Sequence, residues 1–515
     1  MSTKENFSKE ITNGYSFNGE TLTLGGAIFQ GECINNLLIK IPLKTLNRHG
    51  LISGATGTGK TKTLQVLAEQ LSSMSIPVLL MDVKGDLSGI AQPGTVNPKI
   101  EDRHHKIGLD YLPQGFPVEL LTISEEKGIR LRATVSEFGP VLLSKILELN
   151  DTQSSFVSLI FKYCDDVQLP LLDLKDFKRV LQYISNEGKA EIEKEYGKIS
   201  TTSIGTILRK VIELEQQGAE SFFGEKSFEV DDLVRIDENG RGIISIMRLV
   251  DLQDRPKLFS TFMLSLLAEI YSSFPEEGDL SQPKLVIFID EAHLIFKEAS
   301  KALLEQIETI IKLIRSKGVG IFFCTQNPTD IPAIVLSQLG LKIQHALRAF
   351  TAKDRQMIKL TSENYPVSEY YKTDELLTSL GIGEAAITAL NEKGIPTPLT
   401  ALLMRAPQSR MDILNENEID IIVGQSKILG KYNESFDRES AYEMLNRKLE
   451  ISKTQKNEPI PDYRESSRQK SRQQKSTFEK VLTNPTTRQI GNTIVRELAR
   501  GILGVLGLGG TSRRK

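Results

Sequence analysis

The sequence predicts an α/β fold built on a parallel β-sheet that helices cover on both faces. Three observations support this prediction. A glycine-rich loop at residues 54–61 follows a short apolar run and precedes a segment with apolar residues at helical spacing. Further apolar runs, at residues 77–81 and 285–289, each lead into acidic residues. Amphipathic helical segments lie between these runs, and buried apolar strands joined by helices are typical of parallel sheets.

The order of these elements divides the 515 residues into five predicted regions. They are a short β-rich cap (1–46), a core in two segments (47–90 and 241–410), a mainly helical insertion (91–240), a helix with a polar, basic linker (411–480), and an amphipathic C-terminal helix (481–515). The cap is predicted to be β-rich because short apolar runs alternate there with glycine and asparagine. The polar composition around residues 454–477 indicates a flexible C-terminal tail.

The glycine-rich loop matches the phosphate-binding pattern G-x-x-x-x-G-K-[ST], with the strand before it and the helix after it that this pattern requires. It consists of Gly54, Ala55, Thr56, Gly57, Thr58, Gly59, Lys60 and Thr61. Glycine lets backbone N–H groups wrap a phosphate at the positive end of the following helix. Lys60 is then placed to reach the β- and γ-phosphates and Thr61 to bind Mg²⁺. We therefore expect ATP and Mg²⁺ as cofactors.

The insertion and the second core segment differ in pattern. Four amphipathic runs with helical spacing lie in the insertion, at residues 142–149, 156–163, 174–183 and 204–213, and the sequence assigns no chemistry to them. Strand signals return at residues 242–247, 284–289, 319–324 and 341–347. Helices are expected at residues 256–274, 300–316 and 351–365, the last capped by Thr351, and a two-stranded ribbon at 384–404.

The strand at residues 284–289 ends in Asp290 and Glu291, and this pair indicates hydrolysis. Asp290 can hold Mg²⁺ directly or through water, and Glu291 can act as general base toward an attacking water. Residues 290–293 spell Asp-Glu-Ala-His, a tag of helicases with two motor cores. The chain has one phosphate loop, which argues against that class, and His293 is expected to pack at a helix start.

Gln326 follows the next apolar strand, and the sequence Asn327-Pro328 ends that strand sharply. In the additional-strand class of phosphate-loop proteins, this strand lies between the strands that carry the phosphate loop and the carboxylates. A polar side chain at its tip points at the γ-phosphate. Gln326 is therefore expected to sense that phosphate.

The negative charge that develops on the γ-phosphate during its transfer is often stabilised by an arginine, which a neighbouring subunit can supply. The sequence offers three candidates. Arg48 precedes the first core strand, Arg315 lies at the end of the helix predicted at residues 300–316, and Arg348 follows the last core strand. Arg315 is the preferred candidate for an arginine that reaches the next subunit.

Composition indicates an ordinary globular protein, with 39% hydrophobic residues and a net charge of −2. No global positive field attracts nucleic acid, although a local basic lining would suffice to bind DNA. Cys33, Cys164 and Cys324 form no C-x-x-C pair, so they are expected to be reduced thiols rather than zinc ligands or disulfides. No signal peptide or run of about 18 apolar residues is present, so we expect a cytoplasmic protein without a transmembrane segment.

Together these motifs resemble the bacterial HerA-like ATPase family. The matching segments lie in order at residues 47–61, 82–89, 289–294, 314–320, 325–328 and 344–351, within a likeness over residues 20–410. By position, Arg48 and Arg315 are similar to family arginines near the nucleotide, and Asp82 to a carboxylate that faces the site. The N-terminal part is shorter, and the helical insertion longer, than in the archaeal members of the family.

The resemblance implies a RecA-like core, a ring-shaped homo-oligomer (usually a hexamer) and ATP-driven movement on double-stranded DNA. Loops around residues 84–90 or within the insertion are candidates for the pore lining. Two alternatives stay open. One is an ATPase that moves or remodels protein at a secretion or membrane complex, with the C-terminal helix as a docking helix or a membrane-surface helix. The other is a nucleotide-dependent switch that is not a motor.

Overall fold

The computed structural model describes residues 3–278, 280–297, 301–434 and 438–457. The chain divides into two compact units. The first unit contains Met1–Arg132 and Ser227–Glu434, and the second contains Ala133–Lys226 and Ser435–Lys515. The described part of the predicted linker contains three helices, and the predicted C-terminal helix at residues 481–515 lies outside the described residues.

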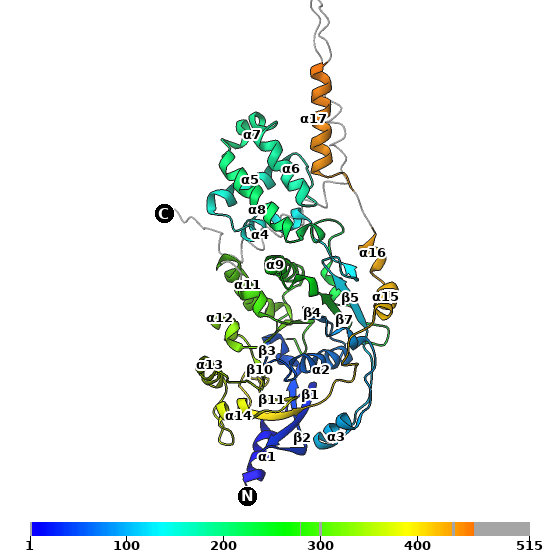
Figure 1. Ribbon diagram of the computed structural model, residues 1–515, viewed down its shortest axis with the longest axis vertical. Helices are drawn as coiled ribbons and strands as arrows, with labels where there is room; N and C mark the ends of the chain where they lie inside the picture. The colour runs from blue at the N-terminus through cyan, green and yellow to red at the C-terminus, as the bar shows by residue number, and fades with distance from the viewer. Residues whose placement is uncertain (1–2, 279, 298–300, 435–437, 458–515) are drawn as a thin grey trace, which may run out of the picture. The chain divides into compact units, whose positions relative to one another are not determined.

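A twelve-stranded sheet forms the centre of the first unit (Figure 1). Its order is β2-β1-β12-β11-β10-β3-β9-β8-β4-β7-β5-β6. The strands are β1 (Thr21–Phe29), β2 (Glu32–Pro42), β3 (Gly50–Ser53), β4 (Val78–Asp82), β5 (Val118–Thr122), β6 (Ile129–Arg130), β7 (Ile244–Arg248), β8 (Leu285–Ile289), β9 (Val319–Thr325), β10 (Leu341–His345), β11 (Glu384–Thr388) and β12 (Thr400–Met404). The half from β10 to β6 is parallel, and β10, β11, β12, β1 and β2 pair antiparallel.

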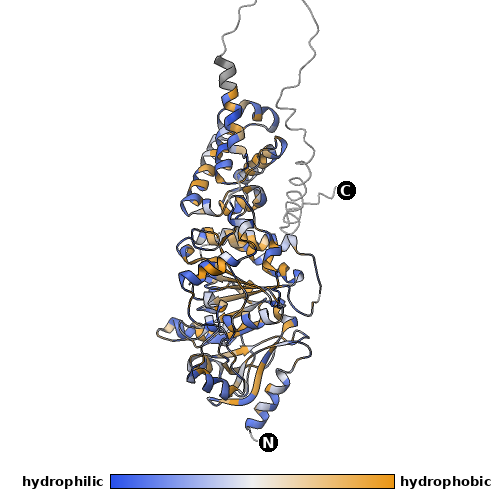
Figure 2. Ribbon diagram, turned by 90° about the vertical axis from the view of Figure 1, so that its right-hand side faces the viewer, coloured by the Kyte–Doolittle hydropathy of each residue, from blue (hydrophilic) through white to orange (hydrophobic). Residues whose placement is uncertain are grey.

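The central parallel strands are buried along their whole length. Every residue of β3, β4, β8 and β9 is buried, as expected of strands covered on both faces. Figure 2 shows these strands as mostly hydrophobic and the surrounding helices as mixed. Strand β9 pairs with β3 on one side and β8 on the other. This order confirms the prediction of the additional-strand class.

Helices of the first unit pack around this sheet. They are α1 (Thr3–Gly14), α2 (Lys60–Ser73), α3 (Pro98–Ile107), α9 (Pro256–Ser273), α10 (His293–Lys297), α11 (Lys301–Ile314), α12 (Ala333–Leu336), α13 (Ala352–Ser362), α14 (Thr373–Ser379), α15 (Glu416–Gln425) and α16 (Leu429–Asn433). Helix α2 contacts β1, β3 and β4, and α11 contacts α9 and β9. The predicted cap of α13 is confirmed, since Thr351 and Asp354 form a capping box. The predicted ribbon is confirmed as the antiparallel pair β11 and β12.

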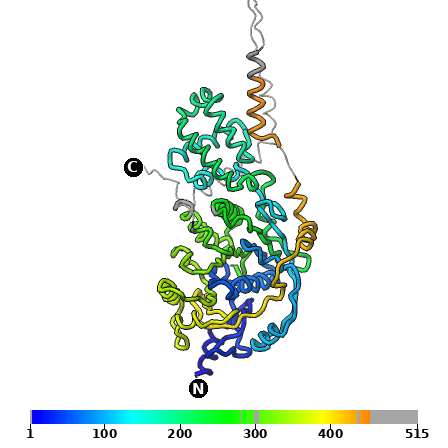
Figure 3. Tube along the Cα trace, in the orientation of Figure 1, coloured from blue at the N-terminus to red at the C-terminus, as the bar shows by residue number. Residues whose placement is uncertain are grey.

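Three elements of the first unit differ from the predicted ones. Residues 1–46 contain helix α1, which was not predicted because only Phe7 and Ile11 of its polar sequence are buried. Strands β1 and β2 are part of the central sheet, and β1 lies beside β12 although more than 350 residues separate them (Figure 3). Residues 91–240 also contain β5 and β6, and β5 pairs parallel with β7.

The second unit is a bundle of helices. They are α4 (Val135–Ile146), α5 (Asp151–Asp166), α6 (Leu174–Ser185), α7 (Lys189–Tyr196), α8 (Thr201–Gln216) and α17 (Ala441–Asn457). The four helices predicted in the insertion correspond to α4, α5, α6 and α8, while α7 was not predicted. Helix α17 packs against α6, where the Asp176 carboxylate accepts the N–H of Tyr442. Apolar faces of α5, α6 and α8 form the core of this bundle.

Candidate active site

The phosphate loop lies at the carboxyl edge of the sheet, between β3 and α2. Gly54, Gly57 and Gly59 have positive φ angles of 149°, 77° and 116°, which residues with a Cβ rarely adopt. A Cβ on Gly54 would lie 2.5 Å from the Cβ of His345, so this position also has no room for a side chain. Gly59 is the N-cap of α2, and the first N–H groups of that helix are available to an anion.

Lys60 folds back over the loop that precedes it. Its Nζ donates to the carbonyl oxygens of Gly54 at 2.7 Å and Ala55 at 3.2 Å. The neighbouring Thr61 lies in the first turn of α2 and is partly exposed. Burial, and next the nearby Lys84 ammonium, lower the pKa of Lys60, while the carboxylates of Glu291 and Asp290 oppose this. A phosphate group would replace the carbonyl contacts of this buried ammonium with stronger, charge-assisted ones.

His345, at the end of β10, supports the phosphate loop from below. Its Nδ1–H donates to the Glu384 carbonyl at 2.8 Å, which leaves Nε2 to accept from the Thr63 hydroxyl at 2.8 Å. Burial lowers the pKa of His345 to about 4, so the ring is neutral. The residue after His345 also contacts the phosphate loop, since the carbonyl of Ala346 accepts the N–H of Ala55. His345 was not predicted as a site residue, although its place at the end of a core strand was a usable signal.

Asp290 and Glu291 lie at the carboxyl end of β8. Both side chains are buried, and Glu291 has a φ of 47°, which is uncommon for a residue with a side chain and frequent at functional sites. The N–H of Ala292 donates to the carbonyl of Cys324 on β9. This bond ties the turn that carries the carboxylates to the strand that carries Gln326.

The two carboxylates share a counter-ion that the sequence analysis did not assign to them. Lys84 Nζ lies 3.7 Å from Asp290 Oδ2 and makes an ion pair with Glu291 Oε1. Burial raises the pKa of Asp290 to about 6, against the pull of the Lys84 ammonium. Burial also acts to raise the pKa of Glu291, but Lys84 and then His293 lower it overall. Glu291 is therefore a carboxylate at neutral pH.

Gln326 lies just beyond β9 at the same edge, with an exposed side chain. It lines two cavities. One of about 430 Å³ also includes Ala55, Thr56 and Arg348. The other, of about 540 Å³, includes His293. The structure thus brings Gln326 beside the start of the phosphate loop.

The three candidate arginines fall on two different edges of the sheet. Arg348 follows β10 and lines the cavity with Ala55 and Gln326. Arg48 lies two residues before β3, and Arg315 lies four residues before β9, so both lie at the amino edge. The seven residues of β9 alone span about 20 Å. Arg48 and Arg315 are therefore distant from the phosphate loop of their own chain.

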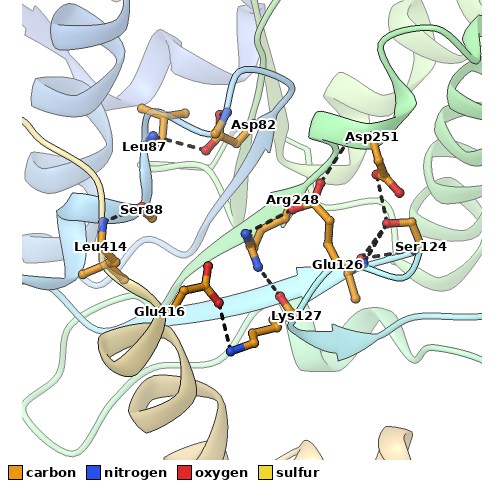
Figure 4. Close-up of polar contacts among 12 residues, drawn as sticks. Asp82, Leu87, Ser88, Ser124, Glu126, Lys127, Arg248, Asp251, Leu414 and Glu416 are labelled. Atoms are coloured by element: carbon orange, nitrogen blue, oxygen red, sulfur yellow. Dashed lines mark hydrogen bonds and ion pairs between the residues drawn. The ribbon is translucent and has the colours of Figure 1, made fainter.

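Asp82, at the end of β4, organises the loop that carries Lys84. Its carboxylate accepts the N–H groups of Gly85 at 2.7 Å and Asp86 at 3.2 Å. It also accepts the N–H of Leu87 at 3.1 Å (Figure 4). Burial, and next the charge of Asp86, raise the pKa of Asp82 to about 7. The Asp82 side chain therefore supports the loop by accepting the loop's backbone N–H groups. Lys84 could have been found from the sequence, because it follows a core strand at the edge where such sites form.

These residues fit a magnesium-bound nucleoside triphosphate. Asp290 Oδ2 is buried and has no hydrogen-bond donor among the described residues. Mg²⁺ is usually held by one or two carboxylates together with substrate phosphates and water. The described part of the chain contains no cluster of three His, Cys, Asp or Glu residues that could hold a metal ion. Thr61 and Asp290 are the residues that would hold Mg²⁺, and the phosphate loop the triphosphate.

No helix among the described residues is both long and apolar enough to cross a membrane.

The family model for helicase HerA-like C-terminal proteins matches residues 30–514. The DNA double-strand break repair helicase HerA of Sulfolobus acidocaldarius is 25% identical over 389 residues, covering 73% of this chain and 69% of the relative. The HerA helicase of Sulfurisphaera tokodaii is 26% identical over 383 residues, covering 71% of this chain and 68% of the relative.

Solved structures with the same fold include two complexes of plasmid coupling protein TrwB. The complex with a non-hydrolysable ATP analogue gives a TM-score of 0.52 at 14% identity and covers 81% of this chain and 96% of that chain. The complex with ADP and Mg²⁺ gives a TM-score of 0.50 at 14% identity and covers 77% of this chain and 99% of that chain. This likeness shows a RecA-like phosphate-loop core with an additional strand.

Proposed function

Because the chain belongs to the family of helicase HerA-like C-terminal proteins, we propose that it is an ATP-hydrolysing motor of the HerA/FtsK type that moves on double-stranded DNA. The observation that carries the hydrolase assignment is the meeting of Lys60, Glu291 and Gln326 at one edge of the sheet. A phosphate loop alone binds nucleotide, whereas a buried carboxylate beside it can also activate water. The curated relatives named as DNA repair helicases support DNA as the track.

Each residue has a defined task in this proposal. The N–H groups of residues 57–61 hold the phosphates, Lys60 neutralises the β- and γ-phosphates, and Thr61 and Asp290 hold Mg²⁺. Bound Mg²⁺ supplies charge neutralisation. Glu291 takes the proton of the attacking water as the bond from the γ-phosphate to ADP breaks, and Gln326 orients that water.

We propose a ring, with six copies as the family predicts. The position of Arg48 and Arg315 supports this proposal, since an arginine at the amino edge reaches a γ-phosphate only in another subunit. An arginine supplied in this way is worth three to five orders of magnitude in rate in enzymes that use one. As a motor that depends on ATP and DNA, the protein would act in the cytoplasm.

Hydrolysis of ATP by the purified chain, with and without duplex DNA, tests this function. We expect duplex DNA to raise the rate at low salt and the effect to fade as salt rises, because phosphate contacts release counter-ions. The Lys60→Ala variant should lose nucleotide binding and hydrolysis together. Hydrolysis that no nucleic acid changes would favour a protein-moving ATPase, and nucleotide binding without turnover would favour a switch.

A further inference from the structure

A cavity of about 480 Å³ lies beside β6, the last strand of the sheet and the sixth strand position from β3. Neighbouring strands are about 4.8 Å apart, so roughly 29 Å of sheet separates this cavity from the phosphate loop. One wall comes from β6 and the loop before it, and the other from α15 and α16. The lining includes Lys127, Arg130, Arg132, Asp420, Leu429 and Asn433. The cavity is therefore separate from the proposed ATP site.

The alternation of side chains along β6 places two arginines on this cavity. Ile129 and Leu131 are buried in the core, whereas Arg130 and Arg132 are partly exposed and line the cavity. Residues two apart on a strand point to the same face, with their Cα atoms about 6.6 Å apart. The strand thus presents two guanidinium groups side by side.

These two guanidinium groups are poorly neutralised. Nη2 of Arg130 lies 3.0 Å from Oε2 of Glu125, a side chain that is 78% exposed, where water screens an ion pair. Arg132 donates to the carbonyl of Tyr432 at 3.0 Å and makes no ion pair among the described residues. Burial, and next the charge of Arg130, lower the pKa of Arg132, while Glu125 opposes this. The two arginines therefore repel each other across the cavity wall.

The carboxylates of the cavity lining are already paired with other cations. Glu126 pairs with Arg248 at 3.1 Å, and Asp420 pairs with Lys127 at 2.9 Å. Lys127 also pairs with Glu416 at 2.9 Å, which joins the loop before β6 to α15 (Figure 4). Because these carboxylates are engaged, the positive charge of the two arginines faces the cavity largely uncompensated.

The opposite wall is fixed to β6 by hydrogen bonds. Asn433 Oδ1 accepts the N–H of Arg130 at 2.9 Å, and its side-chain amide donates to the carbonyl of Gly128 at 3.1 Å. Tyr432 is fully buried, and its hydroxyl accepts the N–H of Glu229 at 2.9 Å. These bonds hold α16 against the edge of the sheet. A ligand therefore meets a preformed cavity and loses little free energy to ordering it.

We propose that this cavity binds a phosphate group between Arg130 and Arg132. A guanidinium group recognises phosphate through paired N–H donors, and one phosphate has enough oxygen atoms to accept from two such groups. The bound anion offsets the repulsion between the arginines. Lys127 borders the same cavity and adds a third positive charge. The phosphate belongs either to a free phosphate compound or to the backbone of DNA, and the two sources are separated by experiment.

The test uses the full chain with its phosphate loop filled by one equivalent of a non-hydrolysable ATP analogue and Mg²⁺. Isothermal titration calorimetry with inorganic phosphate then measures the second site, with sodium chloride at equal ionic strength as the blank. Arg130→Gln and Arg132→Gln should each weaken phosphate binding roughly tenfold or more, because each removes charge-assisted hydrogen bonds. Arg209→Gln is the matched control, since Arg209 is exposed on α8 and bonds to Thr206, and it should leave the affinity unchanged.

A short DNA duplex in place of inorganic phosphate identifies the source. If DNA supplies the phosphate, each glutamine variant weakens duplex binding and lowers the slope of its salt dependence by about one. If a free compound supplies it, the variants weaken binding of inorganic phosphate and leave duplex binding unchanged. Both results support the site. Binding of phosphate and of duplex that neither variant alters, or no binding of either probe to the wild type, overturns it.

Melting temperatures near that of the wild type establish that each variant is folded. If a glutamine variant does not fold, Arg132→Lys replaces it in the test, because lysine keeps the charge and removes the planar pair of donors. This variant should then weaken binding of the probe severalfold, and wild-type affinity for both probes would overturn the proposal. None of these measurements depends on hydrolysis of ATP.

Discussion

His49 provides a prediction whose size follows from the structure. The residue is 2% exposed, and its Nδ1 accepts the Ile321 N–H at 3.0 Å. Its Nε2 lies 2.8 Å from the Ile311 carbonyl, so Nε2 carries the hydrogen and the ring is neutral. Burial lowers the pKa of His49 from 6.5 to about 4, although the bond to Ile311 opposes this. Protonation would break the bond to Ile321 and leave a buried charge.

The direction in which stability changes with pH follows from proton linkage. Between pH 6.5 and 4 the unfolded chain binds a proton at His49 that the folded chain refuses, so stability falls as pH falls through this range. At pH 5 nearly every unfolded chain carries this proton, against about one folded chain in ten. The free energy of unfolding should therefore be about 2 kcal/mol smaller at pH 5 than at pH 7 from this residue alone.

Urea unfolding of the wild type and of His49→Asn, followed by circular dichroism because the chain has no tryptophan, measures this contribution. Asparagine carries a Cβ at the strained backbone of this position (φ 57°, ψ 170°) as histidine does, so this strain is present in both proteins, and asparagine does not titrate. The difference between the two proteins cancels the other titrating groups. The same loss of stability in both proteins between pH 7 and pH 5 would refute the assignment of a neutral, hydrogen-bonded His49.

Three further predictions concern the site. Glu291→Gln should lower kcat by about 10²–10⁴-fold through loss of the general base while ATP binding, measured by calorimetry, persists; equal losses of both would contradict this role. Gly54→Ala should abolish ATP binding and lower the melting temperature, because the new Cβ would lie 2.5 Å from the Cβ of His345. The control Gly31→Ala places its Cβ with nothing within 4 Å, so it should lower the melting temperature only through backbone strain. Arg315→Ala should lower kcat by about 10³-fold without weakening ATP binding, and mixed rings with wild-type subunits should recover part of the rate if the arginine acts across subunits.

The central strands were predictable because their sequences are continuous apolar runs next to recognisable loops. The runs at β4, β8 and β9 are buried on both faces and are therefore apolar almost throughout. They can be recognised as strands without knowing which strands they pair with. Helix α1 and strand β5 were missed for the opposite reason. Helix α1 buries only Phe7 and Ile11, and the five residues of β5 carry no flanking signal distinct from the helices around them.

For the site, the sequence predicts which residues stand at strand ends and leaves open where each side chain points. The loop at residues 84–90 was one of two candidate pore linings in the sequence, and the structure shows in addition that Lys84 pairs with Asp290 and Glu291. Strand direction alone was enough to place Arg48 and Arg315 at the amino edge, since both precede their strands. The support that His345 gives the phosphate loop depends on the pairing of β10 with β3, which is a contact between distant parts of the chain.

The most direct test of the account is the rate of ATP hydrolysis by the purified chain at low salt, measured with and without duplex DNA in wild type and Glu291→Gln. We predict that duplex DNA raises the wild-type rate and that the variant hydrolyses almost no ATP in either condition. A wild-type rate that DNA leaves unchanged, or a variant that hydrolyses ATP as fast as the wild type, would contradict a DNA-driven motor that uses this carboxylate.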